Sequence, residues 1–137
     1  MPGETKQITL TWQQEGLRFV GGEPGRVSIT VDGDNEAGPG PMVTLLLAAA
    51  ACTASDVVVI LQKMRVEFTG LAIEAKGVRR DTEPRRYVAI HLEYKLGGRA
   101  LDPAKIRRAI DLSLEKYCSV FHSLAPDIAV TYALSLA

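Results

Sequence analysis

The sequence lacks any excess of charge of either sign. Its 137 residues carry 16 Lys and Arg against 16 Asp and Glu, so the formal net charge is +0 and the pI is near 6.7. Nothing in this balance favours binding to nucleic acid or to an anionic membrane surface. A basic leader followed by a short apolar segment is also missing, so we expect no signal peptide and a cytoplasmic protein.

Motifs of several common enzyme classes are missing too. No glycine-rich phosphate loop follows a predicted strand, and there is no Gly-x-Ser-x-Gly. The chain also has no Cys-x-x-Cys or His-x-His pair. A zinc site needs three or four ligands, and the one soft set is Cys52, Cys118 and His122. We therefore predict no metal site.

The longest apolar stretch runs from Pro41 to Met64. Proline suits the first turn of a helix, and no Gly or Pro follows until Gly70. We predict a helix roughly 35 Å long, apolar on nearly every face and therefore buried on all sides. The small residues Ala48–Ala51 would let another helix approach closely, so a second subunit is expected to cover part of it. A membrane span is the less favoured alternative, because Asp56 lies in mid-run.

Alternating apolar residues predict strands on both sides of this helix. The expected strands cover residues 7–12, 17–20, 26–31, 68–78, 87–96 and 128–136. Asp102 and Pro103 begin a second, amphipathic helix that reaches Tyr117, and residues 119–124 form a short helical turn. The composition is that of one globular domain over residues 1–137. The order of elements predicts an α+β fold with helices packed on antiparallel sheet.

Two cysteines are present, one in each predicted helical region. They are either small buried hydrophobes or a pair of reactive thiols, and the sequence alone does not bring them together. Cys52 lies about three turns into its helix, where the helix dipole is weak. If Cys52 reacts as a thiolate, a cation must come from elsewhere in the chain.

Two segments, GPGPMVTLLLAAAACTASDVVVILQKM and EKYCSVFHSL, resemble the osmotically inducible protein C and organic hydroperoxide resistance (OsmC/Ohr) family. The resemblance covers most of the chain. It implies one OsmC-like domain over residues 1–137, with antiparallel sheets wrapped around a long buried central helix. It also implies an intertwined homodimer.

The resemblance further implies a cysteine-based thiol peroxidase acting on organic hydroperoxides under oxidative stress. Cys52 would attack the peroxide and become a sulfenic acid, and Cys118 would condense with it to a disulfide. An external dithiol, for example of lipoyl type, would reduce that disulfide. No metal or bound organic cofactor is needed, because sulfur supplies the electrons.

One departure from the family pattern favours a second hypothesis. Well-known peroxidases of the family carry a Glu near the start of the central helix, paired with an Arg that activates the thiolate. No carboxylate stands at positions 41–44 here. Arg18 is our choice for the activating cation, with Arg26 as the alternative, and His122 could tune a thiol. The second hypothesis is a non-enzymatic, small-molecule-binding or redox-sensing dimer.

Overall fold

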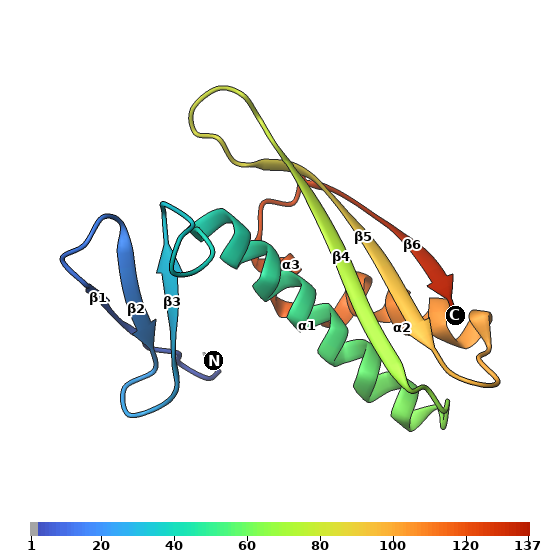
Figure 1. The fold of residues 1–137 in the computed structure, drawn as a ribbon. Helices are drawn as coiled ribbons and strands as arrows, with labels where there is room; N and C mark the ends of the chain where they lie inside the picture. Colours follow the sequence, from blue (N-terminus) through green and yellow to red (C-terminus); the bar gives the residue numbers. More distant parts are fainter. Residues whose placement is uncertain (1–2) are drawn as a thin grey trace. The chain divides into compact units, whose positions relative to one another are not determined.

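The computed structural model describes residues 3–137 (Figure 1). The chain divides into two compact units, one over the described residues up to Leu45 and one from Leu46 to Ala137. Helix α1 (Pro41–Lys63) begins in the first unit and continues into the second. The α+β class predicted from the order of elements is confirmed.

The N-terminal unit contains a three-stranded antiparallel meander in the order β1-β2-β3, as predicted. Its strands are β1 (Thr9–Trp12), β2 (Arg18–Gly22) and β3 (Ser28–Asp32). Large apolar side chains of this unit stay open to solvent, including Trp12, which is 53% exposed. Three strands without a covering layer form little core by themselves.

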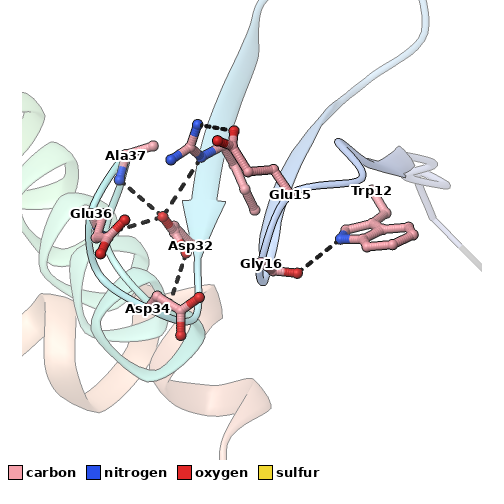
Figure 2. A network of polar contacts seen from close by, with 8 residues as sticks. Trp12, Glu15, Gly16, Asp32, Asp34, Glu36 and Ala37 are labelled. Carbon is pink, nitrogen blue, oxygen red and sulfur yellow. Dashed lines mark hydrogen bonds and ion pairs between the residues drawn. The ribbon is translucent and has the colours of Figure 1, made fainter.

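The carboxylate of Asp32 organises the loop that leads into α1 (Figure 2). It accepts hydrogen bonds from the backbone N–H groups of Asp34 at 2.9 Å, Glu36 at 3.3 Å and Ala37 at 2.9 Å. These donors, with the more distant guanidinium of Arg18, hold the pKa of Asp32 below its ordinary value against the opposing effect of burial. An ionised side chain thus replaces regular secondary structure in fixing this loop.

The C-terminal unit contains a second three-stranded sheet, in the order β4-β5-β6 (Figure 1). Its strands are β4 (Gly70–Arg79), β5 (Tyr87–Gly97) and β6 (Ala129–Leu136). The prediction of a purely antiparallel arrangement is wrong here, because β6 pairs with β5 in parallel. Three helical segments lie between β5 and β6, and such a crossover returns the chain to the end at which β5 began.

The core of this unit lies between one face of the sheet and the helices. Alternate residues of β5 are fully buried, among them Ile90, Leu92, Tyr94 and Leu96. Helix α2 (Pro103–Leu112) contributes Ile106 and Ile110 to the same core. The side chain of Asp102 caps α2 by accepting a hydrogen bond from Ala104 N at 3.0 Å, as the sequence predicted.

Within one chain, α1 is buried along a single stripe only. Ala49, Thr53, Val57 and Leu61 face the interior at intervals of one turn. The prediction of burial on all sides is therefore not met by one chain, since Leu47 is 56% and Val59 48% exposed. Among the described residues α1 is the one helix whose length and composition would suit a membrane span.

The second helix does not continue to Tyr117 as an α-helix. It changes at Ser113 into a five-residue π-helical turn, η1 (Ser113–Tyr117), and the short helix α3 (Ser119–Ser123) follows. The N–H of Cys118 donates to the carbonyl of Ser113 at 2.7 Å, which closes the wider turn. This turn sets the position of Cys118.

Candidate functional site

The structure brings together the two cysteines that the sequence left apart. The sulfur atoms of Cys52 and Cys118 and a carboxylate oxygen of Asp56 all lie within 4.8 Å of one another. Cys52 and Asp56 are four residues apart on α1, so they project from the same face of the helix. Cys118 directly follows the last residue of η1. Both cysteines are free thiols.

The two thiols have unequal surroundings. Cys118 is completely buried, whereas Cys52 is half-buried. Burial raises the pKa of the Cys118 thiol to about 11, a hydrogen bond from Phe121 N–H opposes this, and Cys52 and the charge of Asp56 add to it. Cys118 is therefore a protonated, shielded thiol at neutral pH, and Cys52 is the more accessible one.

A chain of buried hydroxyl groups supports the cluster from the side of the sheet. Thr53 Oγ1 lies 2.8 Å from the phenol oxygen of Tyr94 and 2.7 Å from Ser113 Oγ. Ser113 Oγ in turn donates to Asp56 Oδ2 at 2.9 Å. The chain links α1, β5 and η1, the elements around the two thiols. It orients the carboxylate of Asp56 and ties the π-turn that carries Cys118 to the central helix.

The phenol of Tyr94 is the hydroxyl group of this network that lies furthest from Asp56, and it stays neutral. Burial raises the pKa of Tyr94 to about 12, although its hydrogen bond with Thr53 acts in the opposite direction. Its ring packs edge-to-face against Tyr132 with ring centroids 5.7 Å apart. Tyr94 is therefore a fixed hydrogen-bonding group that stays neutral near neutral pH.

Arg18, the predicted activating cation, lies in the N-terminal unit. Its Nη1 donates to Glu15 Oε2 at 2.7 Å, and its Nε lies 3.8 Å from Asp32 Oδ2 (Figure 2). Nε is buried and has no hydrogen-bond partner within residues 3–137. Arg18 thus has a carboxylate partner, supplied by the turn before β2 rather than by the start of α1. Its role at Cys52 stays a prediction.

The two histidines do not join the thiols. His122 Nε2 lies 3.2 Å from the backbone carbonyl of Leu114, and His91 lies on β5 against Thr131 and Glu93. Across the described part of the chain, neither belongs to the cluster of Cys52, Asp56 and Cys118. The alternative Arg26 falls between β2 and β3 in the N-terminal unit.

Asp56 is the site residue that the sequence reasoning missed. In the sequence its position in the middle of the apolar run argues against a membrane span, and it is not among the predicted site residues. Its spacing of four residues from Cys52 was the available signal, because residues i and i+4 of a helix are neighbours. A carboxylate one helical turn from a cysteine can interact with its thiol. The fold adds Cys118 to this pair, and the three residues together form the candidate site.

Two free thiols and a carboxylate, held by a helix and a π-turn over one face of a mixed sheet, define an α+β protein with a dithiol site. The chain belongs to the OsmC-like protein family, whose sequence profile matches residues 32–133. The family resemblance seen in the sequence is therefore confirmed.

Three known proteins are similar to this chain in sequence or in fold. It is 39% identical over 128 residues to Protein YhfA of Escherichia coli K12, covering 93% of this chain and 95% of that protein. A hypothetical protein from Aquifex aeolicus superposes with a TM-score of 0.85 at 30% identity, covering 98% and 99% of the two chains. The organic hydroperoxide resistance protein OhrB of Bacillus subtilis shares the fold, with a TM-score of 0.61, 16% identity and 98% coverage of both chains.

Proposed function

We propose that this protein is a cysteine-based thiol peroxidase that reduces organic hydroperoxides through the Cys52–Cys118 pair. The observation that carries the proposal is the close approach of two free thiols with unequal exposure. The family supports it, because OhrB, which has the same fold, is an organic hydroperoxide resistance protein. We place the protein in the cytoplasm, where thiols are kept reduced.

In the first step the thiolate of Cys52 attacks one oxygen of the peroxide. An S–O bond forms and the O–O bond breaks, so the sulfur is oxidised to a sulfenic acid and the leaving alkoxide takes up a proton as an alcohol. Cys52 has this role because it is the more accessible thiol, while Cys118 is completely buried. An activating cation is required, and Arg18 is our assignment.

In the second step Cys118 attacks the sulfenic sulfur of Cys52. An S–S bond forms, and the hydroxide that leaves takes the thiol proton of Cys118 away as water. The carboxylate of Asp56 lies within 4.8 Å of both sulfurs and is placed to relay that proton. An external dithiol then reduces the disulfide, so no bound organic cofactor takes part.

The test is a steady-state assay with an alkyl hydroperoxide, comparing dithiol and monothiol reductants in the presence of a chelator. We expect turnover in wild type and none in Cys52→Ser. Cys118→Ser should react once and then accumulate sulfenic or over-oxidised Cys52, visible by intact mass. If Cys118 gains oxygen first, the two roles are reversed.

Absence of turnover, with both thiols nevertheless lost slowly to peroxide, would favour the second hypothesis of a redox-sensing or small-molecule-binding dimer. A mostly apolar pocket in the C-terminal unit gives that hypothesis a place to bind a ligand. It is lined by residues of η1, α3, β6 and the segment between α3 and β6, including Leu114, Phe121, Leu124 and Val130.

A further inference from the structure

Asp56 is an anion without a cationic partner. It lies in the middle of the apolar helix α1, and within residues 3–137 no Lys or Arg forms an ion pair with it. Its side-chain contact is the hydroxyl of Ser113 at 2.9 Å. Two thiols stand beside it, and both would add negative charge on ionisation. A site of this composition is one that a cation would neutralise.

We propose that the reduced protein binds one zinc-like divalent cation through Cys52 Sγ, Cys118 Sγ and a carboxylate oxygen of Asp56. Thiolate and carboxylate are ordinary zinc ligands, at about 2.3 Å and 2.0–2.2 Å from the metal. Tetrahedral coordination at these lengths separates the ligand atoms by about 3.5–3.8 Å. The three atoms already lie within 4.8 Å of one another, so small side-chain movements would complete the geometry.

The surroundings of the three ligands suit a metal site. Ser113 donates to Asp56 Oδ2, Thr53 hydrogen-bonds Ser113, and Tyr94 hydrogen-bonds Thr53. Hydrogen bonds of this kind orient a carboxylate ligand and are usual around bound zinc. Three protein ligands leave one coordination position for water, as in open rather than closed zinc sites. This site replaces the His122-containing set considered from the sequence, because Asp56 and not His122 lies beside the thiols.

The cation and a hydroperoxide would compete for the same thiols. A metal-bound Cys52 is no longer a free nucleophile, so the metal-bound protein is a resting form of the proposed peroxidase. The disulfide form should bind no metal, because neither sulfur retains a thiolate charge. Metal binding needs no peroxide, and peroxide turnover needs no metal. Either proposal can therefore fail while the other stands.

The experiment is a titration of the reduced, chelator-stripped protein with Co²⁺, used as the spectroscopic probe, followed by displacement with Zn²⁺. We expect saturation at one equivalent per chain, with tetrahedral d–d bands and sulfur-to-cobalt charge transfer. Zn²⁺ should remove these bands and slow alkylation of Cys52 at least about tenfold. Protein oxidised to the disulfide with a thiol oxidant should show none of these signals.

Variants separate the three ligands. Asp56→Asn should weaken Co²⁺ binding at least about tenfold, Asp56→Glu should recover part of it, and Cys118→Ser should reduce the charge-transfer intensity. Glu115→Gln, which removes an exposed carboxylate outside the cluster, should bind as wild type does. The absence of saturable binding to wild type overturns the proposal even if a variant fails to fold. Unchanged binding by a folded Asp56→Asn protein removes the carboxylate from the site.

Discussion

At the scale of single residues, Arg18 is the assignment that most needs a test. A guanidinium stays charged when partly buried, and it can stabilise a thiolate that the helix dipole does not reach. We expect Arg18→Ala to slow oxidation of Cys52 by hydroperoxide at least about tenfold, equivalent to ~1.4 kcal/mol. The measurement is single-turnover oxidation at several pH values. Arg26→Ala tests the alternative cation, and equal rates in wild type and Arg18→Ala would remove Arg18 from the site.

Cys118 gives a prediction about pH. Burial raises its thiol pKa to about 11, and the charge of Asp56 contributes to the rise. In chelator-treated Cys52→Ser protein, Asp56→Asn should therefore lower the pKa of Cys118, whereas Glu115→Gln should not. The measurement is the ultraviolet absorbance of the Cys118 thiolate as a function of pH, which gives the pKa of Cys118.

The same shift affects stability. The unfolded thiol ionises near pH 9, whereas the folded one stays neutral up to about pH 11. The stabilisation that comes from this neutral thiol is complete below pH 9 and is lost as the pH rises through that window. Denaturant titrations across that range should show the loss in wild type and a smaller loss in Cys118→Ser.

At the scale of elements, the hydroxyl chain between α1, β5 and η1 should contribute measurably to stability. Thr53 is completely buried, and its hydroxyl serves both Tyr94 and Ser113. Thr53→Val keeps the shape but leaves these two hydroxyl groups without that partner, at a cost of about 1–3 kcal/mol in the free energy of unfolding. Thr69→Val, at an exposed position, is the control. Equal losses of stability in both variants would show that the row of hydroxyl groups has no structural role.

Much of the element order could be predicted from the sequence. Pro41 after its glycine-proline lead-in gave the start of α1, and the alternation around Leu92 and Tyr94 gave β5. The parallel pairing of β6 could not be predicted, because alternation does not carry strand direction. The π-turn could not be predicted either, since the pattern of Ser113–Tyr117 is that of an ordinary helix.

The candidate site was predictable to a lesser degree. The pairing of Cys52 with Cys118 came from the family resemblance, because two residues so far apart in sequence are brought together by the fold alone. Asp56 could have been found from its spacing to Cys52. The hydroxyl chain could not, because Thr53, Tyr94 and Ser113 come from three separate segments and meet only through packing.

At the scale of the whole molecule, the open side of α1 predicts a partner. A groove between α1 and β4 is lined almost wholly by apolar and small residues, including Leu47, Ala51, Val59, Leu71 and Ile73. An exposed apolar surface of this kind marks an interface, and the family resemblance implies a homodimer. We expect an obligate dimer whose interface exceeds roughly 2,000 Å².

Light scattering tests the dimer directly. Wild type should have the mass of two chains at micromolar concentration, and Leu47→Glu or Val59→Glu should dissociate or unfold it. Gln62→Glu, which adds a carboxylate at an already polar position of the same helix, should leave the dimer intact. A folded wild-type monomer at that concentration would contradict the prediction.

The distance between the sulfur atoms of Cys52 and Cys118 depends on the number of residues in the π-turn η1. Glu115, Lys116 and Tyr117 are exposed, so substitutions there should be tolerated. Removing one of them is different, because a turn that closes with five residues would have to close with four, and the following residue would rotate by about 100° around the helix axis.

Deletion of Glu115 should therefore separate Cys118 from Cys52, and diamide should then fail to form the intrachain disulfide. Glu115→Ala should still form it. In this segment, chain length is under tighter constraint than chemical identity, so natural variation should appear there as exchanges and not as gaps.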